Sequence, residues 1–248
     1  MRTITGLIHV HSTFSHDGWH SLEELGRFGA SQGYSFIGMS EHSDDLDGQK
    51  VIAYVKECLR FSSPECLIIP GIEFSCDMGF HLIGLGVKHY TDLKDPIQVS
   101  QFIRDNGGVA ILAHPIRHGY RIPLELARTL DGIEVWNAGY DGRFVPDDRT
   151  LRLLNDFRRR NGFLTAFGGE DLHRITDPPR VQIRLKCEDV REDVVLRALR
   201  HGEFEIFNSY FRFDARQPQG ALSLAGIVIA QRAYSIMKRL RDLLGLSR

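Results

Sequence analysis

A repeated unit constrains this chain more than any other sequence feature. Short apolar runs typical of buried strands alternate with amphipathic segments that have helical spacing. Such alternation predicts parallel strands covered by helices. We count six or seven units over roughly 210 residues, which favours a barrel-like closure over an open sheet. The expected strands are 4–10, 35–40, 66–74, 81–87, 109–113, 132–136, 162–167 and 203–207, and the expected helices are 21–32, 49–60, 96–105, 122–129, 147–160 and 190–200.

The first expected helix shows how well these boundaries are marked. Ser21 stands at the N-cap position, and Glu24 follows three residues later, which is the spacing of a capping box. Gly33 stands where a helix is commonly terminated by a glycine. We therefore expect this helix to begin and end close to these residues.

Length and composition limit the class of protein. A chain of 248 residues suits one large α/β domain, or one domain with an appendage, and can bury a full core. A net charge of -1 gives no overall reason to expect binding of long nucleic acid. The four cysteines form no CxxC pair, and we find neither a secretory signal nor an apolar run of about 18 residues. We expect reduced cysteines and a cytoplasmic location.

Histidines and carboxylates stand at the ends of the apolar runs. His9 and His11 are two residues apart on one expected strand, so they project to the same face. Glu73 ends another run, and His114 ends a third. The same placement recurs at Asp17, His42, Asp171 and His173. Any one of these could be an ordinary polar residue of a loop, but that reading is poor for so many strands at once.

Such donors indicate a metal site. The carboxyl ends of parallel barrel strands open onto one face, where active sites assemble. Imidazole and carboxylate ligands suit zinc, manganese or iron, and the absence of cysteine ligands argues against a structural zinc site. The sequence therefore predicts a divalent-metal centre on this face.

The motifs resemble those of the PHP superfamily, the polymerase and histidinol phosphatase proteins. The resemblance runs from about Thr3 to Phe207. It implies a distorted (β/α)7 TIM-like barrel over residues 1–215, with 216–248 as an added C-terminal amphipathic helix. The motifs are His9-Val10-His11 with Asp17-Gly18, Ser40-Glu41-His42, Pro70-Gly71-Ile72-Glu73, His81-Leu82-Ile83-Gly84-Leu85, Ala113-His114-Pro115 and Gly169-Glu170-Asp171-Leu172-His173.

The resemblance also implies how the ligands are shared among up to three divalent ions. One ion would be held by His9, His11, Glu73 and Asp171. A second would be held by Glu73, His81 and His114, with Glu73 bridging the two. The third would be held by Asp17, His42 and His173.

Three positions depart from the common pattern of these motifs. Glu41 stands where aspartate is frequent, Leu7 where an acid is frequent, and Glu170 where serine is frequent. None is a ligand position, so the departures concern the surroundings of the ligands and the choice of substrate.

The implied activity is hydrolysis of a phosphate ester by a metal-bridging hydroxide, with catalytic roles for Glu73, Asp171 and Arg117. We expect a small phosphorylated substrate, such as a nucleotide, a sugar phosphate or a histidinol-phosphate-like amine. A nuclease or phosphodiesterase, or a non-catalytic metal-binding module, are the alternatives. The candidates for phosphate contact are Arg117, Arg143 and Arg174, and those for a general acid are His16, His20 and His118.

Aromatic and basic residues elsewhere have simpler readings. Trp136 fits the core, while Tyr140 could be core or a stacking surface for a base. Arg158, Arg159 and Arg160 end a helix, where cations complement the helix dipole, and this is favoured over nucleic-acid binding.

The C-terminal segment differs from the repeated units. An apolar stripe recurs along 221–246 at helical spacing. Packing on the barrel or on a second copy in a homo-oligomer is favoured, and binding to a membrane surface is the alternative. The stripe comprises Leu222, Ala225, Ile229, Ala233, Ile236, Met237, Leu240 and Leu244, and the basic residues are Arg232, Lys238, Arg239, Arg241 and Arg248.

Overall fold

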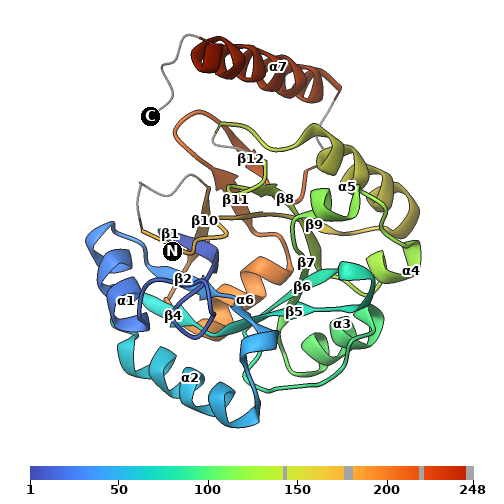
Figure 1. The fold of residues 1–248 in the computed structure, drawn as a ribbon. Helices are drawn as coiled ribbons and strands as arrows, with labels where there is room; N and C mark the ends of the chain where they lie inside the picture. Colours follow the sequence, from blue (N-terminus) through green and yellow to red (C-terminus); the bar gives the residue numbers. More distant parts are fainter. Residues whose placement is uncertain (142–143, 176–180, 218–220, 244–248) are drawn as a thin grey trace.

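The computed structural model describes residues 1–141, 144–175, 181–217 and 221–243, with the main chain alone at 161, 221–223, 235 and 238–243 (Figure 1). Its helices are α1 (Leu22–Ser31), α2 (Gly48–Phe61), α3 (Pro96–Asp105), α4 (Leu124–Ala127), α5 (Asp148–Asn161), α6 (Glu192–Arg200) and α7 (Ala221–Leu243). Its strands are β1 (Arg2–Val10), β2 (Phe36–Met39), β3 (Glu41–His42), β4 (Leu67–Ile69), β5 (Gly71–Ser75), β6 (His81–Leu85), β7 (Val109–Leu112), β8 (Gly132–Asn137), β9 (Thr165–Gly169), β10 (Gln182–Cys187), β11 (Phe204–Phe207) and β12 (Arg212–Asp214).

The strands form two six-stranded sheets, in the orders β12-β11-β10-β1-β2-β4 and β3-β5-β6-β7-β8-β9. The sheets are neighbours because β2 continues into β3 through Ser40, and β4 continues into β5 through Pro70. Proline has no N–H for a strand ladder, which accounts for the interruption at Pro70. At the other end, the chain after β9 bonds to β1: Glu170 N donates to Ile8 O at 3.0 Å, and Leu172 N donates to His9 O at 3.0 Å.

The predicted α/β class is confirmed, but the structure does not show a closed parallel barrel. The two sheets are not closed, and β5–β6, β6–β7 and β1–β10 pair antiparallel. The physical reason is plain between β5 and β6. Only residues 76–80 connect them, whereas a parallel crossover needs about a dozen residues. The strands β10 and β12 were not predicted. β10 alternates buried and more exposed residues and so lacks an apolar run, and β12 belongs to a hairpin with β11 and not to a strand–helix unit.

The helices α1 to α5 lie around the outside of the strands (Figure 1). The capping box at α1 is confirmed, since Ser21 accepts from Glu24 N and the Glu24 carboxylate accepts from Ser21 N at 2.8 Å. A small core cluster between α1, α2 and the first sheet includes Leu25, Tyr54 and Cys58. All four cysteines are free and buried. The larger cluster fills the rest of the domain.

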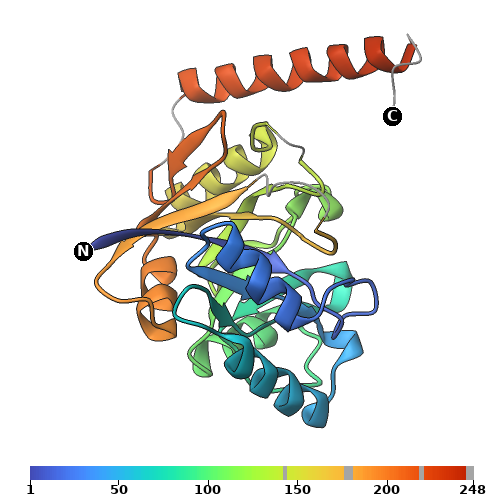
Figure 2. The ribbon, with the colours of Figure 1, turned by 90° about the vertical axis from the view of Figure 1, so that its left-hand side faces the viewer.

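Helix α7 lies along one side of the domain and extends beyond it (Figure 2). Its first half packs on the domain through buried Leu224 and Ile227, and Gln231 Nε2 donates to Pro146 O at 2.9 Å. Among the described side chains of the predicted stripe, those of Ala225, Ile229, Ala233, Ile236 and Met237 are exposed, so the packed face is not the predicted one. Leu222 and Leu240 have no described side chains, and Leu244 lies outside the described residues.

The exposed face of α7 carries the apolar side chains of Ile229, Ile236 and Met237. Contact with a second copy or with a membrane surface stays a prediction. No helix in the described part of the chain is long and apolar enough to cross a membrane.

The junction between β4 and β5 generates a stability prediction. A Cβ added at Gly71 would lie 2.2 Å from the backbone oxygen of Met39, whereas one added at Gly48 would meet nothing within 4 Å. We expect Gly71→Ala to lower the free energy of unfolding by about 1–3 kcal/mol, as overpacking does. Gly48→Ala, at the start of α2, should leave it unchanged or raise it slightly. Denaturant unfolding of both variants measures the difference. Equal stability of the two would contradict this account of the junction.

Candidate metal centre

The strand ends bring the predicted ligands to one edge of the structure. His9 is on β1, His42 is on β3 and Glu73 is on β5. His81 is the first residue of β6, but β6 runs antiparallel to β5, so His81 pairs with Ser75 at the last position of β5. The remaining ligands follow strand ends or lie in the loop after β1: His11, Asp17, His114, Asp171 and His173.

Three of these residues have an unusual backbone. His9, His114 and Asp171 have positive φ angles of 62°, 25° and 52°. Non-glycine residues in such conformations cost of order 1–3 kcal/mol each and cluster at functional sites. The pairing of β1 with β2 shifts register between Ile8 and Val10, at His9. The backbone is therefore distorted where the ligands converge.

The residues of the first predicted ligand set lie close to one another. His9 Nε2 lies 3.4 Å from Asp171 Oδ1 and 3.7 Å from Glu73 Oε2. His11 Nε2 lies 3.5 Å and 3.8 Å from the same two oxygens. Donors about 2.0–2.1 Å from a tetrahedral ion are separated by about 3.3 Å, close to these spacings. Donor atoms of His9, His11 and Glu73 lie within 4.8 Å of one another, and Asp171 belongs to a second such group with His9 and His114. Such groups can hold a divalent cation.

Glu73 is the centre of the whole arrangement. Its Oε1 lies 2.8 Å from His81 Nδ1 and 2.9 Å from His114 Nε2, which completes the second predicted set. Its Oε2 lies 3.0 Å from His42 Nδ1 and also faces the first set. One buried carboxylate, 2% exposed, therefore contacts the ligands of all three predicted sites.

The third predicted set lies at the open side of the site. Asp17 Oδ1 is 3.2 Å from His42 Nε2, and Asp17 Oδ2 is 3.2 Å from His173 Nε2. The side chains of Asp17 and His173 are 42% and 29% exposed, whereas His9 and His11 are 0% exposed. An ion held by this set would be the most accessible of the three.

The donors fit divalent cations. Among the described residues, five overlapping groups of three His or carboxylate ligands have donor atoms within 4.8 Å of one another. Nε2 atoms of His9, His11 and His173 and Oδ1 of Asp17 are buried without a hydrogen-bond partner. Unpaired buried donors of this kind call for an explanation, and a cation supplies one.

Without cations, protons offset the charge of the carboxylates. Burial lowers the pKa of His42, but hydrogen bonding to Glu73 and the charges of Glu73 and Asp17 outweigh it and raise the pKa to about 9. Burial likewise opposes charge on His9, yet Asp171, Glu134 and Glu73 raise its pKa above the usual range. Despite burial, neighbouring histidines hold the pKa of Glu73 and of Asp171 low. The carboxylates of the site thus stabilise the protonated forms of His9 and His42.

Glu134 supports the ligands, and sequence reasoning missed it. Its Oε1 lies 2.9 Å from His9 Nδ1, and its Oε2 accepts from His114 N at 2.8 Å and from Asn137 Nδ2 at 2.9 Å. A carboxylate on the second ring nitrogen fixes the orientation of a metal-binding histidine. The glycine at position 169 permits this approach, because a Cβ added there would lie only 1.8 Å from Glu134 Oε1. The available signal was a glutamate inside the apolar run of β8.

Two of the departing motif residues also have structural roles. The fully buried Glu41 accepts from Ser12 Oγ at 2.7 Å and from Ser15 Oγ at 2.6 Å, which ties the loop after β1 to β3. Burial raises the pKa of Glu41 to about 7. Glu170 accepts a hydrogen bond from Val181 N. Neither residue lies at a ligand position.

The candidate phosphate-binding residues have different surroundings. Arg117 lines the cavity over the ligands, and its Nη1 lies 3.4 Å from His81 Nε2. The guanidinium of Arg174 instead lies over the Trp19 ring, 4.4 Å from its centroid. Arg143 lies outside the described residues. The cavity has a volume of about 410 Å³ and is also lined by His16 and Tyr140.

Two of the general-acid candidates, His20 and His118, do not line this cavity. His118 packs on the Phe80 ring, 4.6 Å between centroids, and His20 Nε2 accepts from Ile175 N at 3.0 Å. Trp136 is 0% exposed, so the core reading is confirmed. Tyr140 is 45% exposed and its ring lies 4.9 Å from that of His114.

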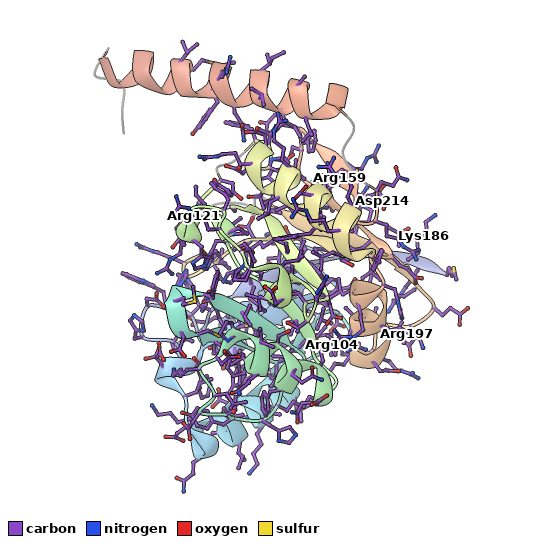
Figure 3. The ribbon with its side chains drawn as sticks, turned by 90° about the vertical axis from the view of Figure 1, so that its right-hand side faces the viewer. Arg104, Arg121, Arg159, Lys186, Arg197 and Asp214 are labelled. Carbon is purple, nitrogen blue, oxygen red and sulfur yellow. The ribbon has the colours of Figure 1, made fainter. Side chains whose placement is uncertain are left out.

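The basic end of α5 has structural partners. Arg158 Nε donates to Leu164 O at 2.6 Å, while Arg159 and Arg160 pair with Asp156. Figure 3 shows Arg159 on α5, far from Arg104 and Arg197, which come from other elements. The basic residues labelled on this side come from separate elements.

Comparison with known proteins identifies solved structures of similar fold. No family model matches the chain, and no curated protein matches it. A two-domain protein from Bacteroides vulgatus, described as containing a PHP-like metal-dependent phosphoesterase, is 16% identical with a TM-score of 0.61, over 84% of this chain and 65% of its own length. The chain shares the fold of PHP-like phosphoesterases.

Two further solved structures agree with this assignment of the fold. PsfC from Pseudomonas syringae is 14% identical with a TM-score of 0.58, over 94% of this chain and 98% of PsfC. An amidohydrolase from Chromobacterium violaceum, solved with bound sulfate and no metal, is 15% identical with a TM-score of 0.52, over 82% of this chain and 97% of its own length. At these identities the three structures show the fold alone, and the first of them is the one described as PHP-like.

The contacts of Glu134 predict its effect on metal binding. We expect Glu134→Gln to weaken binding of the first ion about 10- to 100-fold, because His9 loses its charged partner. Chelator competition with zinc on metal-stripped protein measures this. Glu205→Gln, on β11 in a partly exposed pair with Arg184, is the control and should bind like wild type. Equal affinity of the two variants would show that Glu134 does not position His9.

The raised pKa of His42, about 9, predicts a pH dependence of metal affinity. At neutral pH the metal-free ring is protonated, so a cation must displace a proton. Affinity for the third ion should rise as pH increases toward 9, by about tenfold per unit for each proton displaced. Zinc titrations at several pH values, with proton release followed in weak buffer, measure this. Affinity independent of pH would contradict the assignment of His42 as a ligand.

Proposed function

We propose that the chain is a metal-dependent phosphoesterase of the PHP superfamily that hydrolyses the phosphate ester of a small molecule. The observation that carries the proposal is the position of Glu73, whose two oxygens face histidines of three adjoining ligand sets. The fold shared with structures described as metal-dependent phosphoesterases supports it.

The roles of the residues follow from their positions. His9, His11, Glu73 and Asp171 would hold one ion, Glu73, His81 and His114 a second, and Asp17, His42 and His173 a third. Histidine-rich donor sets favour zinc, manganese or iron over magnesium or calcium. Divalent ions bound there supply a hydroxide at neutral pH and neutralise charge on phosphate oxygens.

The protein's own side chains would bind and orient the substrate. Without cations, Asp17, Glu73 and Asp171 would repel a phosphate, so the negative charge of the site suits cation binding first and anion binding second. Arg117, in the cavity wall beside His81, is placed to contact a phosphate oxygen. Glu73 and Asp171 act by holding the cations, which is the catalytic role we assign to them.

The dimensions of the cavity favour a small substrate. A volume of about 410 Å³ can enclose a phosphate with a modest organic group. Tyr140 is an exposed aromatic ring in the same wall, so a nucleotide is among the candidates, and cleavage of a phosphodiester is the second candidate function. A cytoplasmic location is proposed from the four free, buried cysteines.

Turnover on defined substrates tests the proposal. Inorganic phosphate release would be measured from phosphomonoesters, dinucleotides and short oligonucleotides, with metal-stripped protein and added manganese or zinc. We expect metal-dependent release from monoesters and a loss of about 10²–10³-fold or more in Asp171→Ala. Asp193→Asn, an exposed carboxylate on α6, is the control and should keep full activity.

Arg117 gives a second test of the same proposal. Arg117→Met should raise KM for a phosphomonoester, by about 10- to 100-fold for a lost charged hydrogen bond of 1.5–3 kcal/mol, while metal content stays at the wild-type value. Phosphodiester cleavage without monoester cleavage would favour the second candidate. Full activity of metal-stripped protein or of Asp171→Ala would overturn the proposed function.

A further inference from the structure

His16, at the open side of the site, lies beside two predicted metal ligands but belongs to none of the three predicted sets. His16 immediately precedes Asp17 in the loop after β1. A ring nitrogen of His16, a carboxylate oxygen of Asp17 and a ring nitrogen of His42 lie within 4.8 Å of one another. The rings of His16 and His42 are 5.5 Å apart between centroids. Asp17 and His42 are two of the three donors assigned to the outer ion.

Asp45 holds His16 in place from two directions. Its Oδ2 accepts from the backbone N–H of His16 at 3.0 Å and lies 2.8 Å from the ring Nδ1. With the Nδ1 proton donated to this carboxylate, the neutral ring carries its free lone pair on Nε2. A carboxylate bound to the far nitrogen is how proteins orient metal-binding histidines and raise their basicity. His9 has the same arrangement with Glu134, at 2.9 Å.

Like the second set of Glu73, His81 and His114, the outer set has fewer than four assigned donors, and it is the set that lies beside His16. It has three assigned protein ligands, and tetrahedral sites closed by protein have four. The inner set of His9, His11, Glu73 and Asp171 already offers four donors. His16 is 71% exposed, so it can adjust to an ion without disturbing the core.

We propose that His16 is a fourth protein ligand of the outermost ion and that Asp45 is its positioning residue. The inference rests on the proposed metal centre and adds a ligand that the motif resemblance does not contain. It makes the outer ion a tightly held part of the centre, where three exposed donors alone would bind it weakly.

Cobalt binding to the metal-stripped, full-length protein tests this ligand directly. Cobalt(II) replaces zinc in such sites, and its visible absorption changes with the number and kind of donors. We expect wild type to bind three cobalt ions. His16→Ala should weaken the third ion about 10- to 100-fold and alter the absorption of that ion alone. Asp45→Asn should weaken the same ion less. His89→Ala, an exposed histidine beyond β6, is the control.

The outcomes separate this ligand from the proposed function. If His16→Ala and His16→Gln both bind the third ion with wild-type affinity and absorption, His16 is not a ligand and the inference fails. If wild type binds no cobalt, both the inference and the metal centre fail. If cobalt binds as expected but no phosphate ester is cleaved, the ligand assignment stands and the proposed activity fails. Circular dichroism of each variant verifies that it is folded.

Discussion

The structure depends on one buried carboxylate, Glu73, among the histidines that converge on it. Removing such a charge from water is costly unless it is paired. Glu73 lies within 3.0 Å of ring nitrogens of His42, His81 and His114, which come from β3, the start of β6 and the residue after β7. Its other contacts reach β1 through His9. Positive charge beside Glu73, carried by protons or by metal ions, therefore stabilises the contact between the two sheets.

The fold is distorted where it serves the site. Positive φ angles at His9, His114 and Asp171 and the register shift in β1 aim side chains that a regular strand would direct elsewhere. Buried hydrogen bonds offset this strain: Glu134 joins His9 to the backbone of His114, and Leu172 N donates to His9 O. These bonds connect β8 and the residues after β9 to β1, so the candidate ligands lie where the two sheets meet.

Sequence reasoning found the candidate ligands, which the structure places close together, but not the residues that contact them from behind. Motifs such as His9-Val10-His11 and Ala113-His114-Pro115 are local, so a single sequence reveals them, and the structure brings all nine predicted ligands to one edge. Glu134 is 125 residues from His9 in the chain, and its role follows only from the packing of β8. The antiparallel pairing of β6 and of β10 and the hairpin of β11 and β12 were missed because a parallel strand–helix pattern was assumed. The packed face of α7 differed from prediction because apolar residues occur around much of that helix, and the buried ones among its described side chains are Leu224 and Ile227.

The central claim is that Glu73 bridges two metal ions, and anomalous scattering from crystals soaked in zinc or manganese tests it most directly. The account predicts anomalous peaks on both sides of Glu73, one among His9, His11 and Asp171 and one beside His81 and His114, at about 2.0–2.2 Å from the donor atoms. It also predicts that Glu73→Gln removes or weakens both peaks together. Peaks that persist in Glu73→Gln, or metal bound elsewhere with these donors bare, would contradict it.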